Sequence, residues 1–129
     1  MADEMKTTTR IRGGALLARA LQEKGVEHVF TLAGGFCNPA LEGFMEAQMK
    51  VINCPHEQIA GHLADGHTRI TRKPAVCLVG PEGFANAVPA MMEAWGERSP
   101  VIFVTGSSTL KRQGAVSYTH LTLPTNREV

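Results

Sequence analysis

One glutamate stands where a carboxylate can do chemistry. Glu57 follows the apolar run Val51–Cys54, which predicts a buried strand, and it begins a segment with apolar residues at helical spacing. That apolar face consists of Ile59, Ala60, Leu63, Ala64 and Ile70. We therefore expect Glu57 at the carboxyl end of a strand, the edge where open α/β sheets bind ligands. The alternative is a carboxylate in the first turn of a helix, favoured only by the helix dipole.

Glycine-rich turns follow two other predicted strands. Gly34 and Gly35 come after the strand expected over 26–32, and Gly83 closes the turn that follows the strand over 75–79. Glycine lets a ligand approach the backbone, and we expect positive φ at the Gly34-Gly35 turn. Asn86 lies three residues past Gly83, as a ligand contact or as a helix-surface amide. Neither turn has the G-x-G-x-x-G or G-x-x-x-x-G-K-[ST] pattern of nucleotide-binding loops.

Histidines and cysteines near Glu57 do not have the spacing of a metal site. A zincin motif that begins at His56 would need a second histidine where Ala60 stands. His62 and His67 are five residues apart and share a helix face poorly. We expect no metal ligands in this chain. Three widely spaced cysteines, Cys37, Cys54 and Cys77, indicate reduced thiols in a cytoplasmic protein.

Strand and helix patterns alternate four times. The first helix is expected over 15–24, and Gly25 ends it. The second begins with Asn38 as N-cap and Pro39 at its first position. The third is the segment that begins at Glu57, and the fourth begins at Phe84. Strands are expected over 26–32, 51–54, 75–79 and 101–105. This alternation predicts an α/β fold with a mostly parallel sheet. All four strand-to-helix segments then lie along one edge, and three of them contain glycine.

The larger apolar residues of two helices are spaced to form buried stripes. One stripe is Leu41, Phe44 and Met45, and the other is Phe84, Val88, Met91, Met92 and Trp95.

Length and charge exclude several classes of protein. The 129 residues suit one domain, and a net charge of +1 gives no case for nucleic acid or an anionic membrane surface. No apolar run approaches the length of a membrane span. We expect a flexible N-terminus over 1–12 and a truncated domain over 13–115. The tail over 116–129 has neither a helix face nor a fifth unit, resembles translated sequencing adapter, and is expected to be non-native.

Several motifs together resemble one family. Gly25-Val26-Glu27-His28-Val29-Phe30, Gly34-Gly35, His56-Glu57-Gln58 with Ala64-Asp65-Gly66, and Lys73-Pro74-Ala75-Val76-Cys77-Leu78-Val79 occur in order. They resemble the pyrimidine-binding domain of thiamine-diphosphate enzymes, in the style of the acetolactate synthase large subunit and 2-hydroxyacyl-CoA lyases. The resemblance implies a three-layer sandwich around a mostly parallel sheet, left incomplete here.

The resemblance also implies roles for the residues above. Glu57 would be the catalytic acid, which hydrogen-bonds N1′ of the cofactor's aminopyrimidine and favours its imino form. Gly34, Gly35, Gly83 and Asn86 would complete the thiamine diphosphate site, although Ala33 and Glu82 depart from the family's usual loops. Magnesium and the diphosphate would be held by a domain absent here, from a partner subunit in a homodimer or tetramer. The fragment alone is then expected to be inactive.

Three functions stay open. The first is a fragment of an enzyme that decarboxylates or joins 2-keto acids or cleaves 2-hydroxyacyl thioesters such as acyl-CoA substrates. The second is a free-standing pyrimidine-binding subunit of a two-chain decarboxylase. The third is a non-enzymatic, flavodoxin-like binding module in which Glu57 is only a helix-cap charge.

Overall fold

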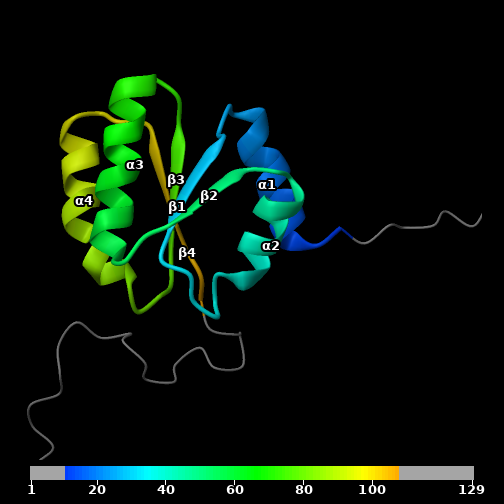
Figure 1. Ribbon diagram of the computed structural model, residues 1–129. Coiled ribbons are helices and arrows are strands. Elements are labelled where there is room, and N and C mark those ends of the chain that lie inside the picture. Colours follow the sequence, from blue (N-terminus) through cyan, green and yellow to red (C-terminus); the bar gives the residue numbers. More distant parts are fainter. Residues whose placement is uncertain (1–10, 108–129) are drawn as a thin grey trace, which may run out of the picture.

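The computed structural model describes residues 11–107 and shows helices and strands in alternation (Figure 1). In chain order the elements are α1 (Gly13–Glu23), β1 (His28–Thr31), α2 (Asn38–Glu46), β2 (Lys50–Asn53), α3 (Glu57–Thr71), β3 (Ala75–Val79), α4 (Phe84–Gly96) and β4 (Val101–Thr105).

The four strands form one parallel sheet in the order β2-β1-β3-β4. Val29 of β1 pairs with Val51 on one side and with Val76 on the other, which places β1 in the interior of the sheet. Helices α1 and α2 cover one face, and α3 and α4 cover the opposite face (Figure 1). The predicted α/β fold with three layers and a parallel sheet is confirmed.

Two apolar cores lie on the two faces of the sheet. The core between the sheet and helices α1 and α2 includes Val29, Leu41 and Phe44. The core between the sheet and helices α3 and α4 includes Ala60, Cys77 and Ala87. Every residue of β3 is buried, as expected for a strand covered on both faces.

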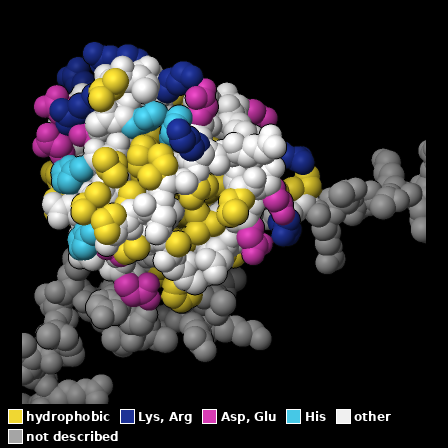
Figure 2. All heavy atoms as spheres, viewed as in Figure 1, with side chains coloured by type: hydrophobic (Ala, Val, Ile, Leu, Met, Phe, Trp, Pro, Cys, Tyr) yellow, Lys and Arg dark blue, Asp and Glu magenta, His cyan; other side chains and the backbone are white. Residues whose placement is uncertain are grey.

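Leu41 and Phe44 of α2 are buried as predicted, but α3 and α4 bury mainly small residues and expose several large ones, so the predicted stripes are wrong in part. In α4 the buried residues are Ala87, Ala90 and Ala94, whereas Met92 is 64% and Trp95 is 82% exposed. Exposed large apolar residues on the helices also include Met45, Ile59, Leu63, Ile70 and Val88. Figure 2 shows hydrophobic side chains gathered on the viewed surface. Small residues face inward because the helices lie too close to their neighbours for larger ones.

Glycines allow this close approach. A Cβ on Gly43 of α2 would lie 2.2 Å from the carbonyl carbon and oxygen of Gly14 in α1. A Cβ on Gly61 of α3 would lie 2.5 Å from the Cβ of Ala90 in α4. Both distances are far below ordinary van der Waals contact. Each helix pair therefore crosses at a glycine, which fixes the spacing of the helices that carry the candidate site.

Local predictions were confirmed at some turns and wrong at others. Gly25 has φ +81 just after the end of α1, as a helix-terminating glycine requires. Gly34 and Gly35 are not among the positive-φ residues, so the expectation for that turn was wrong. Asn38 is the first helical residue of α2 and not its N-cap, which is Cys37 without a side-chain cap bond. The turn at Gly34-Gly35 is instead closed by a hydrogen bond from the Cys37 N–H to the Gly34 carbonyl, 2.8 Å.

Two predictions fall mostly outside the described residues. The predicted boundary at residue 115 and the tail over 116–129 are not described, nor are residues 1–10 of the predicted N-terminus. Among the helices within 11–107, none combines the length and apolar character that crossing a membrane requires.

Candidate functional site

The sheet has a switch point between β1 and β3. The chain leaves β1 toward β2 through α2 on one face, and it leaves β3 toward β4 through α4 on the other. At such a point the two outgoing connections diverge and leave a crevice at the carboxyl ends of the strands. The turns after β1 and β3, which contain Gly34-Gly35 and Gly83, begin at this edge of the sheet.

Glu57, Gly83 and Asn86 meet at this edge. Asn86 Nδ2 donates a hydrogen bond of 3.1 Å to Glu57 Oε2. A Cβ on Gly83 would lie 2.2 Å from Glu57 Oε1 and 2.5 Å from its Cγ, so the glutamate side chain lies directly on the Gly83 backbone. The Glu57 side chain is only 15% exposed. The carboxyl group is thus held between the first turns of α3 and α4.

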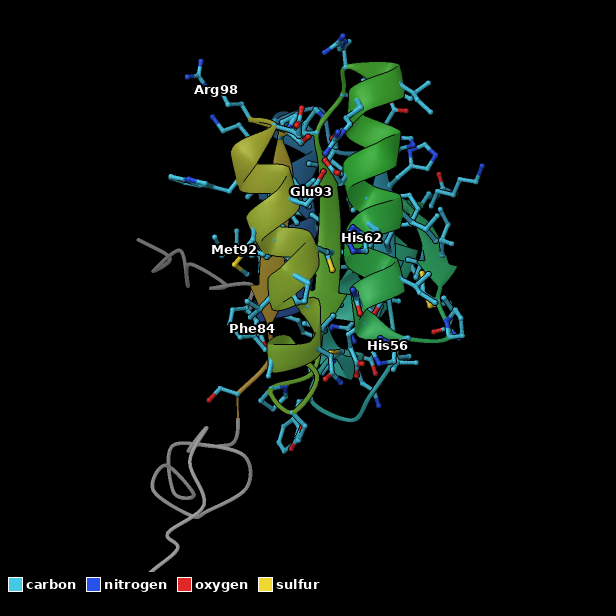
Figure 3. The ribbon with its side chains drawn as sticks, turned by 90° about the vertical axis from the view of Figure 1, so that its left-hand side faces the viewer. His56, His62, Phe84, Met92, Glu93 and Arg98 are labelled. Atoms are coloured by element: carbon cyan, nitrogen blue, oxygen red, sulfur yellow. The ribbon has the colours of Figure 1, made fainter. Side chains whose placement is uncertain are left out.

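The first turn of α3 is fixed by His56. Its backbone is extended, and its Nδ1 accepts a hydrogen bond of 3.2 Å from the Gln58 N–H, which caps the helix. His56 Nε2 lies 4.0 Å from Glu57 Oε2, too far for a hydrogen bond. Figure 3 shows His56 at the beginning of α3 and Phe84 at the beginning of α4, at the same end of the molecule. This cap role of His56 was missed in the sequence, where histidine is not among the usual N-cap residues.

Two buried thiols, Cys54 and Cys77, belong to the core under α3 and α4. Burial, the nearby Cys54 and the charge of Glu57 together raise the pKa of Cys77 to about 12. Burial also raises the pKa of Cys54. These thiols stay protonated near neutral pH, so Cys77 adds no charge near Glu57.

Gly34 and Gly35 lie on the same edge without contacting Glu57. Both are exposed, and a Cβ on either would meet nothing within 4 Å, so open space lies beside them. The turn reaches across the end of β3 toward β4, since a Cβ on Gly106 would lie 2.7 Å from the Phe36 carbonyl oxygen. The site residues predicted from the sequence thus form a close group of three and a separate turn of two glycines facing open space.

A hollow in the surface lies elsewhere. It has a volume of about 620 Å³ and is lined by Ala94, Trp95, Arg98, Ser99 and Val101. Figure 3 places Arg98 at the end of α4 opposite to His56 and Phe84. The lining of this hollow contains no carboxylate, thiol or imidazole. Within the part of the chain from 11 to 107, no cluster of three or more His, Cys, Asp or Glu could hold a metal ion.

Comparison with protein families decides the identity of the fold. Residues 11–126 match a family described as "Thiamine pyrophosphate enzyme, N-terminal TPP binding domain". This chain belongs to the thiamine pyrophosphate enzymes. The resemblance inferred from the motifs is confirmed, and the TPP binding domain is the part of these enzymes that the chain represents.

Curated relatives of the TPP binding domain include enzymes of two kinds. The chain is 32% identical over 115 residues to the acetolactate synthase large subunit of Mycobacterium tuberculosis, covering 88% of this chain and 21% of that protein. It is 36% identical over 115 residues to mouse 2-hydroxyacyl-CoA lyase 2, covering 86% of this chain and 18% of that protein. The chain therefore spans about a fifth of the length of the curated relatives that it matches.

A solved structure confirms the fold of the TPP binding domain. The thiamine diphosphate-dependent 4-hydroxybenzoylformate decarboxylase of Rhodococcus jostii superposes with a TM-score of 0.72 at 22% identity, covering 78% of this chain and 19% of that one. At this identity the likeness supports the arrangement of helices and strands alone.

Proposed function

We propose that Glu57 is the acid that contacts the aminopyrimidine ring of thiamine diphosphate, in an enzyme that acts on 2-keto acids or 2-hydroxyacyl thioesters. The observation that carries this proposal is the placement of the Glu57 carboxyl group. It is 15% exposed, lies on the backbone of Gly83 and accepts a hydrogen bond from Asn86 at the switch point of a parallel sheet.

The residues of the site fit an aminopyrimidine. The Glu57 carboxyl group lies near the protonated Cys77 thiol, which adds no competing charge, and a carboxyl group can share a proton with a ring nitrogen. The turn at Gly34 and Gly35 leaves open space at the same edge, where a flat ring can approach the backbone. When bound, thiamine diphosphate supplies a carbanion at its thiazolium ring and an electron sink for decarboxylation. In that chemistry Glu57 holds or moves the proton at the ring nitrogen, and Gly83 leaves the room that the Glu57 side chain occupies.

We further propose that the diphosphate and Mg²⁺ are held outside this chain, by a second domain of a partner subunit. The acidic and thiol groups of the described site do not form a metal cluster. Large apolar side chains are exposed on α3 and α4, such as Leu63, Met92 and Trp95. Exposed apolar residues of this kind are typical of surfaces that pack against another domain or subunit. A homodimer or tetramer that closes the cofactor site agrees with this exposure.

The proposal is tested by Glu57→Gln in the full-length enzyme. The amide keeps the size of the side chain but cannot donate the carboxyl proton, so we expect cofactor activation to fall by a factor of about 10²–10⁴. The measurement is the rate of deuterium exchange at C2 of bound thiamine diphosphate, followed by NMR, together with turnover of a 2-keto acid. Circular dichroism and the urea midpoint serve as folding controls. Exchange at the wild-type rate in a folded variant would refute the role of Glu57.

A further inference from the structure

The side chain of Asn86 faces Glu57. Its Nδ2 is 3.1 Å from Glu57 Oε2, and this is the hydrogen bond that joins the first turns of α3 and α4 at the site. The two residues are 29 positions apart in the sequence. In the part of the chain that the structure describes, Oε1 of Glu57 accepts no hydrogen bond and lies beside the Gly83 backbone. The two carboxyl oxygens therefore have different surroundings.

We propose that Asn86 is a positioning residue that acts through Glu57 and does not itself bind the cofactor; this inference rests on the proposed function of Glu57. An amide N–H can only donate, so it fixes Oε2 as an acceptor. The proton that the carboxyl group exchanges is then confined to Oε1. Asn86 thereby sets which oxygen faces the ring and holds the rotamer of Glu57 before any ligand arrives.

The backbone of α4 holds Asn86 in place. Gly83 is the N-cap of α4, and the Asn86 N–H donates to the Gly83 carbonyl at 3.1 Å. The residue that makes room for the glutamate thus also anchors the turn that carries the asparagine. Farther along, α3 and α4 meet where Gly61 approaches Ala90, which fixes the distance between the two helices. Glu57 and Asn86 are therefore aligned by packing that is independent of a cofactor.

Two titratable groups lie near the Glu57 carboxyl group and must be separated from it in any pH profile. His56 Nε2 is 4.0 Å from Oε2, and the charge of Glu57 acts on the Cys77 thiol. Cys77 titrates far above neutral pH and does not contribute to the acidic limb. His56→Asn removes the imidazole and retains a good N-cap residue, so a limb that persists in this variant does not come from His56.

The test compares Asn86→Ala and Asn86→Asp in the full-length enzyme, with Glu57→Gln as reference and Asn38→Ala as control. Asn38 is an exposed amide at the first residue of α2, where it does not cap the helix. The measurements are C2 deuterium exchange of bound thiamine diphosphate against pH, and kcat and the KM for the cofactor.

We expect Asn86→Ala to slow exchange about tenfold, the effect of one lost hydrogen bond to a charged group. The acidic limb should move to higher pH, because a donated N–H stabilises an ionised carboxylate. Asn86→Asp should move the limb further, since two adjacent carboxylates resist joint ionisation. The effect should appear in kcat with little change in the KM for the cofactor, and Asn38→Ala should behave as wild type.

Three results would overturn the inference. If Asn86→Ala and Asn86→Asp retain the wild-type rate and limb while Glu57→Gln is inactive, Asn86 does not position Glu57 and the proposed function stands. If the variants raise the KM for the cofactor without moving the limb, Asn86 binds the cofactor directly. If Glu57→Gln keeps the wild-type rate, the proposed function fails and the inference fails with it.

Discussion

The contact between Gly61 and Ala90 gives a sharp test of how α3 and α4 are held together. A Cβ on Gly61 would lie 2.5 Å from the Cβ of Ala90, which is 0.9 Å short of an ordinary contact at 3.4 Å. Since Ala90 Cβ is attached directly to the α4 backbone, only a shift of the helix can relieve this overlap. Gly66 is in the interior of the same helix, and a Cβ there would meet nothing within 4 Å.

The two glycines form a matched pair. Replacing either glycine by alanine gains helix propensity, about 1 kcal/mol in favour of the folded state. Gly66→Ala should therefore stabilise the protein. Gly61→Ala has the same gain but adds an overpacking cost of about 1–3 kcal/mol. The propensity gain cancels in the comparison, so the free energies of unfolding of the two variants should differ by the overpacking cost alone.

Urea unfolding followed by far-UV circular dichroism measures this difference. A second substitution, Ala90→Gly, removes the methyl group that Gly61→Ala meets but itself loses about 1 kcal/mol of helix propensity. The relief of the overlap is therefore read from the coupling energy of the double-mutant cycle. The coupling energy of this cycle should be about 1–3 kcal/mol. The reasoning fails if Gly61→Ala is as stable as Gly66→Ala, or if the cycle with Ala90→Gly shows no coupling.

Two further predictions concern charge and thiols. Burial raises the pKa of Asp65, but the hydrogen bonds and charge of Arg69, at 3.0 and 2.6 Å, lower it more, so the net pKa lies below the ordinary 3.8. The ion pair therefore stabilises the fold above pH 3.8, and this stabilisation is lost as the pH falls below that value. In Asp65→Asn, the urea midpoint should fall less on acidification than in the wild type. An unchanged fall would contradict the assignment. Cys37, Cys54 and Cys77 are buried with raised pKa values, so a thiol reagent at pH 8 should label them only after unfolding, and rapid labelling of the native chain would contradict their burial.

The strands and the position of Glu57 could be predicted from the sequence because their signals are local. The run over 75–79 is apolar throughout, and the run over 101–105 is apolar up to Thr105. Each follows a proline, and both strands have those bounds in the structure. Glu57 begins α3 as expected, because a strand and an amphipathic helix meet there. The assignment of Glu57, Gly34, Gly35, Gly83 and Asn86 to a cofactor site stays a prediction.

The inward faces of the helices could not be predicted, because α3 and α4 carry apolar residues on more than one side. Ala60 and Ala64 are buried while Ile59 and Leu63 are 43% and 45% exposed. Periodicity identifies an apolar stripe but does not tell how closely the neighbouring helix approaches, and that distance selects small residues. The hydrogen bond from Asn86 to Glu57 could not be predicted from the sequence either, because it depends on the side-chain rotamers of residues in two different helices.

The pairing of β1 with β3 joins two αβαβ halves of the chain, one ending with β2 and the other beginning with α3. The Gly34-Gly35 turn belongs to the first half, whereas Glu57, Gly83 and Asn86 belong to the second. The candidate site is thus a seam between the halves. A ligand that contacts both halves binds only when they are packed together. Its binding therefore stabilises their packing, and the free energy of separating the halves rises with its affinity and concentration.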